Sequence, residues 1–231
     1  MIVSPSVLAM DYSKMKEQTE ALNASKAEWL HFDVMDGHYV PNLSFGPDLL
    51  RGFDKLSDLT MDVHLMVEDP GKFIKPFVDA GADIITVHEE VLHDYERGME
   101  MCQYIHSFGI KAGLAINPMT DVRRLQAYLR HYDLFLIMCV EPGYGGQPFR
   151  PASISKIKNL RRWIDASHSD ALISVDGGIK LDTGRECVAA GTDVLVAGSY
   201  VFKDDIEKAV ESLVNCGDRV KADKVSTRDS R

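Results

Sequence analysis

The sequence has no apolar run long enough to cross a membrane. Its longest run is the seven residues 134–140, whereas a transmembrane helix needs about 20 apolar residues. Residues 1–5 lack the basic segment and the apolar core of a signal peptide. We therefore expect no membrane association.

Cysteines and basic runs are also scarce. The four cysteines, Cys102, Cys139, Cys187 and Cys216, are widely spaced and form no C-x-x-C pair, which argues against a zinc ribbon or a disulfide framework. We expect buried, reduced thiols and a cytoplasmic protein. The 26 Lys and Arg are outnumbered by 35 Asp and Glu, which gives a net charge of −9. We therefore expect no nucleic-acid partner, although a small anionic substrate is compatible with this charge.

Eight short apolar runs alternate with eight amphipathic stretches along the chain. The apolar runs are residues 2–8, 29–33, 61–66, 84–88, 112–116, 134–140, 172–176 and 194–197, and the amphipathic stretches are residues 12–23, 47–56, 70–80, 95–108, 122–129, 151–166, 181–190 and 205–216. This pattern predicts an all-parallel sheet with helices outside it. A doubly wound open sheet has the same alternation, but eight units in a chain of 231 residues, close to the roughly 250 typical of the fold, favour a single (β/α)8 TIM barrel. We assign residues 1–217 to the barrel and expect the polar residues 218–231 to form a disordered tail.

Side chains of metal-binding types stand where three predicted strands end. His31 and Asp33 are two residues apart and so share one face of their strand, while His64 and Asp176 belong to two later strands. Taken singly, such a histidine is more often a hydrogen-bonded core residue, and an aspartate before glycine more often forms a turn. Functional groups of a barrel gather at this end of its strands, however, and burying two carboxylates without Lys or Arg is costly. The four residues therefore predict one divalent metal ion, Zn²⁺, Fe²⁺, Mn²⁺ or Co²⁺.

Glycine-rich segments follow the last three predicted strands. Their glycines and neighbours are Gly143, Tyr144, Gly145, Gly146, Gly177, Gly178, Gly198 and Ser199. Tight turns need glycine in any case, but glycine-rich turns also let backbone N–H groups converge on a phosphate. Because the loops after strands seven and eight are the usual phosphate site of this fold, we expect a phosphorylated ligand.

Five motifs now point to one family. They are SPS at residues 4–6, HFDVMDGHYVPN at 31–42, DVHLM at 62–66, PGYGGQ at 142–147 and VDGG at 175–178. In this order, across residues 2–214, they resemble the ribulose-phosphate 3-epimerase family. The resemblance implies a TIM-barrel isomerase that interconverts D-ribulose 5-phosphate and D-xylulose 5-phosphate, and a homo-oligomer. Tyr144 stands where family members more often have Phe.

The resemblance also implies roles for individual residues. It makes His31, Asp33, His64 and Asp176 the metal ligands, and Asp33 and Asp176 the acid/base pair. The residues it places at the substrate are Ser6, Gly143, Tyr144, Gly145, Gly146, Gly178, Gly198 and Ser199. We expect Met35, His64, Met66 and Gly177 at the substrate as well. Two carboxylates could remove and return the C3 proton on opposite faces while a metal stabilises the enediolate. Met35 and Met66 should share the inward face of Asp33 and His64, either as a water-excluding lining or as ordinary core.

Other functions fit parts of this pattern. An allulose-6-phosphate 3-epimerase would keep the site and change the sugar. A metal-dependent phosphosugar hydrolase would need a separate base for its water. A barrel decarboxylase for a nucleotide would need a lysine among its aspartates, and residues 33–36 contain none. A non-catalytic sugar-phosphate binding protein would not need two carboxylates on the metal.

Overall fold

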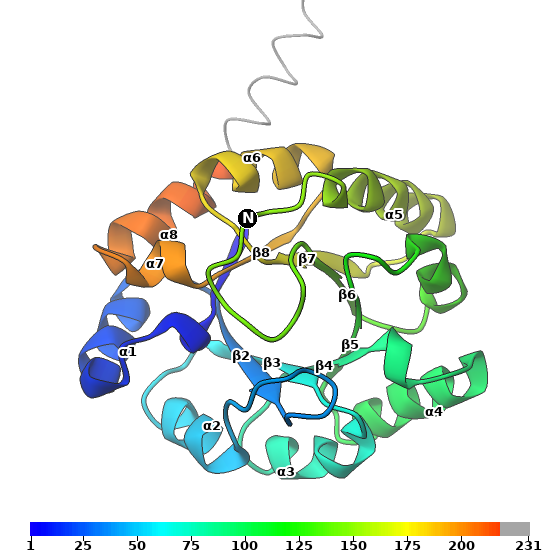
Figure 1. Cartoon of the computed structure of the whole chain (residues 1–231), viewed down its shortest axis with the longest axis horizontal. Coiled ribbons are helices and arrows are strands. Elements are labelled where there is room, and N and C mark those ends of the chain that lie inside the picture. The colour runs from blue at the N-terminus through cyan, green and yellow to red at the C-terminus, as the bar shows by residue number, and fades with distance from the viewer. Residues whose placement is uncertain (218–231) are drawn as a thin grey trace, which may run out of the picture.

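A ring of eight parallel strands forms the centre of the molecule (Figure 1). This computed structural model describes residues 1–217. The strands are β1 (Ile2–Pro5), β2 (Trp29–Met35), β3 (Thr60–Met66), β4 (Ile84–His88), β5 (Lys111–Ile116), β6 (Leu134–Met138), β7 (Leu172–Asp176) and β8 (Val194–Ala197). They pair in the order β1-β8-β7-β6-β5-β4-β3-β2, and an isolated parallel bridge between Ser6 and His31 joins β1 to β2. The predicted TIM barrel is confirmed.

The helices surround this ring (Figure 1). The α-helices are α1 (Met15–Ala24), α2 (Pro47–Asp54), α3 (Ile74–Val78), α4 (Tyr95–His106), α5 (Ser153–Ser167), α6 (Leu181–Ala190), α7 (Ser199–Phe202) and α8 (Ile206–Val214). The 3-10 helices are η1 (Val7–Ala9), η2 (Tyr12–Lys14), η3 (Pro70–Lys72), η4 (Glu89–Val91) and η5 (Val122–Tyr128). Within residues 1–217, none of these helices combines the length and the apolar character that a membrane span requires.

An apolar layer fills the barrel interior where the strands begin. It consists of Trp29, Ile84, Leu134 and Val194, the first residues of β2, β4 and β6 and of β8. Alternate strands supply such layers because parallel strands are staggered around a barrel. With that end closed by apolar packing, the polar side chains farther along β2 and β3 face the other end. The site is thereby confined to the C-terminal ends of the strands.

Several predicted boundaries are wrong. The strand expected at residues 2–8 ends at Pro5, because the Ser6 hydroxyl accepts the Leu8 N–H (3.4 Å) and begins η1. The strand expected at residues 134–140 ends at Met138. The stretch 122–129 forms a 3-10 helix, whose buried residues Val122, Leu125 and Tyr128 recur every third position, as three residues per turn require. The tail expected at residues 218–231 lies outside the described residues.

Gly98 gives a test of the packing between α4 and its neighbours. A Cβ atom on Gly98 would lie 2.5 Å from the hydroxyl oxygen of the buried Tyr128. Helix propensity favours Ala over Gly by about 1 kcal/mol, but overpacking a close contact costs about 1–3 kcal/mol. We therefore expect Gly98→Ala to lower the free energy of unfolding, as measured by urea denaturation.

Gly52→Ala in α2 is the matched control. A Cβ atom there meets only the methyl carbon of Met15 at 3.7 Å, an ordinary contact. We expect this variant to raise the free energy of unfolding by up to about 1 kcal/mol. Equal stability of the two variants would contradict the packing argument.

Candidate active site

Four side chains of metal-binding types converge at one end of the barrel. His31 and Asp33 come from β2, His64 from β3 and Asp176 from the end of β7. Each offers a ligand atom, and these atoms all lie within 4.8 Å of one another. The structure thus brings together the residues that the sequence predicts. One detail differs, because β2 continues to Met35 and places His31 and Asp33 inside the strand rather than at its end.

The spacing of these atoms fits a single metal ion. Asp33 Oδ1 lies 3.3 Å from His31 Nε2 and 3.1 Å from His64 Nδ1. Ligands that bind one ion tetrahedrally at about 2.0–2.1 Å are about 3.3 Å apart. Within residues 1–217, the buried His31 Nε2 has no hydrogen-bond partner. An ion of this kind would satisfy that nitrogen.

Asp62 orients the His31 ring, and sequence reasoning missed this role. His31 Nδ1 lies 2.7 Å from Asp62 Oδ2, and both side chains are buried. An ionised carboxylate assigns the ring proton to Nδ1, which leaves Nε2 directed at the cluster with its lone pair. The signal was present in the sequence, since Asp62 precedes His64 by two residues as His31 precedes Asp33.

The two candidate acid/base carboxylates differ strongly in proton affinity. Burial, followed by the nearby charge of Asp33, raises the pKa of Asp176 to about 7. Burial also opposes ionisation of Asp33, but the nearby charge of His31 and the hydrogen bond from His64 outweigh it and hold the pKa of Asp33 well below its usual range. Near neutral pH, one carboxylate is therefore ionised while the other can carry a proton.

The imidazoles of His31 and His64 also differ from each other in pKa. Burial disfavours a charged His31 ring, yet the carboxylates of Asp33 and Asp62 outweigh burial and hold the pKa of His31 well above its ordinary value. Burial lowers the pKa of His64 to about 4. The carboxylates that hold a proton on His31 would also attract a divalent cation. Binding of that cation would release the proton.

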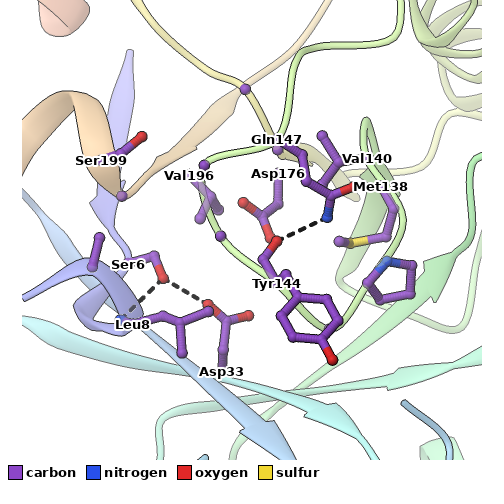
Figure 2. A pocket seen from close by; sticks show the side chains of 18 of the residues that line it. Ser6, Leu8, Asp33, Met138, Val140, Tyr144, Gln147, Asp176, Val196 and Ser199 are labelled. Carbon is purple, nitrogen blue, oxygen red and sulfur yellow. Dashed lines mark hydrogen bonds between the residues drawn. The ribbon is translucent and has the colours of Figure 1, made fainter. Parts of the chain in front are cut away.

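A cavity of about 330 Å³ opens beside this cluster. Figure 2 shows the Asp33 and Asp176 side chains directed into it, with the Ser6 hydroxyl donating to Asp33 Oδ2 (2.6 Å). The predicted substrate residues that line it are Ser6, Met35, Met66, Gly143, Tyr144, Gly145, Gly146, Gly177, Gly178, Gly198 and Ser199. His64 is fully buried and belongs to the side-chain cluster instead of the lining. Lining residues that sequence reasoning missed include Leu8, Met138 and Gln147.

The loop after β6 lies across the barrel mouth and is held by hydrogen bonds (Figure 1). Gln147 Nε2 donates to the Glu141 and Tyr144 carbonyls at 2.6 and 2.8 Å. Asn42 Nδ2 donates to the Gly143 carbonyl at 2.7 Å, so the loop after β2 supports it from one side. These bonds place a glycine-rich backbone over the cavity.

The loop after β7 requires glycine for its shape. Gly177 and Gly178 have φ angles of 111° and 66°, in the left-handed region that favours glycine. A Cβ on Gly178 would lie 2.4 Å from the Phe149 nitrogen, so the two loops approach more closely than any other residue permits. Among the described residues, no Lys or Arg side chain lines the cavity. An anionic ligand there would depend on backbone N–H groups.

The two methionines combine both roles that the sequence left open. Met35 and Met66 line the cavity, and they also pack with Val40, Leu8 and Tyr39 in a small apolar cluster. This apolar wall stands beside the carboxylates. It limits the space for water around them.

Comparisons with known proteins agree with this geometry. A family model described as the ribulose-phosphate 3 epimerase family matches residues 2–202. A ribulose-phosphate 3-epimerase from Synechocystis is 42% identical over 202 residues, 87% of each chain. One from Escherichia coli is 39% identical over 214 residues, 92% of this chain and 94% of the relative. The solved 3-hexulose-6-phosphate synthase from Salmonella typhimurium has a TM-score of 0.67 at 16% identity, over 95% of this chain and 100% of that one, which shows the fold alone.

The family match and the relatives cover nearly the whole barrel. They confirm the resemblance carried by the five motifs, and with it the prediction of an isomerase. The chain belongs to the ribulose-phosphate 3-epimerase family.

Proposed function

We propose that the chain is a metal-dependent epimerase that inverts C3 of a phosphorylated ketose and interconverts D-ribulose 5-phosphate and D-xylulose 5-phosphate. The observation that carries this proposal is the pair of carboxylates, Asp33 and Asp176, which enter one cavity beside two imidazoles. The names of the curated relatives support the choice of reaction. The homo-oligomeric state stays a prediction.

Asp33 and Asp176 are suited to exchange a proton on two faces of a sugar. In the ring of strands, β2 and β7 are separated by β1 and β8, so the carboxylates approach a ligand from different sides. The ionised Asp33 can remove the C3 proton from one epimer, and Asp176 in its protonated form can deliver a proton to the opposite face. In the reverse direction the roles exchange.

The same cluster would hold the metal. His31, Asp33, His64 and Asp176 are the ligands we propose, and nitrogen with carboxylate donors suits Zn²⁺, Fe²⁺, Mn²⁺ or Co²⁺. When bound, the ion supplies Lewis-acid stabilisation of the negative charge that develops on the substrate oxygens. Met35 and Met66 line the cavity and would limit the water around an enediolate.

The phosphate group would lie against the glycine-rich loops. Gly178, Gly198 and Ser199 line the cavity together with the loop after β6. Because no cationic side chain lines it in the described chain, we assign phosphate binding to the N–H groups of these segments.

The substrate preference tests this function directly. The curated relatives are named ribulose-phosphate 3-epimerases, which favours the five-carbon sugar over a six-carbon one. We expect a higher kcat/KM for D-ribulose 5-phosphate than for D-allulose 6-phosphate. A preference for the hexose phosphate would favour the allulose-6-phosphate epimerase, and release of inorganic phosphate would favour the hydrolase.

Replacing Asp176 separates proton transfer from binding. Asp176→Asn keeps an oxygen donor but cannot carry the proton, so we expect kcat to fall by about 10²-fold or more. Asp33 remains able to exchange the C3 hydrogen of one epimer with solvent, which NMR in D₂O would detect. Epimerisation at the wild-type rate would make Asp176 a structural residue only.

Gly145→Val tests the phosphate site. Gly145 lines the cavity and a Cβ on it has nothing within 4 Å, so the added side chain would enter open space beside the proposed phosphate without straining the protein. We expect KM for the phosphorylated sugar to rise by about tenfold or more. This KM should depend little on salt concentration, because no Lys or Arg side chain takes part in binding the phosphate.

Gly46→Val is the control for this variant. Gly46 also has nothing near its Cβ position, and it lies outside the cavity lining. Its KM should match the wild type. A steep dependence of KM on salt, or equal turnover of unphosphorylated ribulose, would show that the phosphate site is wrongly assigned.

A further inference from the structure

A buried chain of hydrogen bonds leads from His64 away from the cavity. His64 Nε2 lies 2.8 Å from His88 Nε2, and both side chains are fully buried. On its far side, His88 Nδ1 lies 2.9 Å from the Tyr39 hydroxyl and 3.2 Å from Glu90 Oε2. None of the roles described so far uses His88 or Glu90.

Two neutral imidazole rings carry too few protons to donate at every contact in this chain of hydrogen bonds. Two nitrogens 2.8 Å apart share one proton, so His64 and His88 have only one more proton for their two outer nitrogens. One of these, His64 Nδ1, faces Asp33, and the other, His88 Nδ1, faces the Tyr39 hydroxyl and Glu90. Either Asp33 or Glu90 must therefore face the lone pair of a ring nitrogen. A cation between His64 Nδ1 and Asp33 removes this conflict, because the remaining ring proton can then lie on His88 Nδ1 and face Glu90.

The surroundings of Glu90 favour its ionised form. Its Oε1 accepts the Asn117 backbone N–H at 2.7 Å and the Thr120 hydroxyl. Burial opposes ionisation, but the hydrogen bond from His88 and those two donors lower the pKa of Glu90 to about 2. An ionised Oε2 can only accept, so the Tyr39 hydroxyl donates to it (3.4 Å) and the His88 ring proton lies on Nδ1.

We propose that Glu90, acting through His88, is a positioning residue that leaves His64 Nδ1 free to bind a divalent cation. A proton on His88 Nδ1 leaves a lone pair on its Nε2, which accepts the proton of His64 Nε2. His64 Nδ1 is then an unprotonated ligand directed at Asp33. This inference rests on the metal site of the proposed function and extends it to residues outside that site.

Glu90→Gln should exchange the donor and acceptor roles along this chain of hydrogen bonds. Because Oε1 already accepts two donors, the new amide would place its oxygen there and its NH₂ group against His88 Nδ1. His88 would then accept at Nδ1 and donate from Nε2, so that His64 would carry its proton on Nδ1 and lose its free ligand atom. Glu89→Gln is the matched control, since Glu89 lies in the same 3-10 helix but pairs with Arg124 at 2.7 Å.

The test measures zinc affinity by competition with a chromogenic chelator after the protein has been stripped of metal. Ring-¹⁵N NMR of the metal-free protein reports which nitrogen of His64 carries the proton, and thermal unfolding checks the fold. We expect Glu90→Gln to weaken zinc binding by about 10–100-fold and to move the His64 proton to Nδ1. Glu89→Gln should match the wild type in both measurements.

Wild-type zinc affinity or an unchanged His64 tautomer in Glu90→Gln would overturn the inference. So would an equal loss in Glu89→Gln, since it would indicate a general effect on the helix. His64→Ala distinguishes this failure from failure of the proposed function. If the wild type binds no zinc, or if His64→Ala binds it as tightly as the wild type, the metal site itself is wrong.

Discussion

Buried negative charge is the constraint on which the active end of this barrel depends. Asp33 and Asp62 are 3% and 1% exposed, and within residues 1–217 no Lys or Arg side chain lines the adjoining cavity. Unpaired carboxylates cannot be buried at this depth without a large cost in free energy. Ring protons, the Ser6 hydroxyl and, in our proposal, a divalent cation offset that cost. Catalysis would use the same charge, because an ionised carboxylate beside a protonated one can exchange a proton.

The parallel register of β2 and β3 organises this charge. It sets His31 beside Asp62 and Asp33 beside His64, so each carboxylate has an imidazole on the neighbouring strand. On the side of His64 away from Asp33, His88 likewise pairs with a carboxylate, because it links His64 to Glu90. Glycine-rich loops close the opposite side of the cavity. The strands thus position the carboxylates and imidazoles, while the loops after β6 and β7 shape the cavity beside them.

Much of this could be predicted from the sequence because it depends on local periodicity. Alternation of apolar runs and amphipathic stretches predicts the barrel, and the two-residue spacing of His31 and Asp33 places both in its interior. The link from His64 to Glu90 could not be predicted, because it depends on the pairing of β3 with β4 and on the 3-10 helix that follows β4. The end of β1 at Pro5 depends likewise on a side-chain cap at Ser6.

The most direct test of the central claim is the exchange of the C3 hydrogen with solvent. Wild-type protein, with its metal content determined, would be incubated with D-ribulose 5-phosphate in D₂O and followed by NMR. Our account predicts deuterium at C3 of both epimers and about one divalent ion per chain, with exchange lost when the ion is removed. Epimers that form without deuterium at C3, or full activity in metal-free protein, would contradict it.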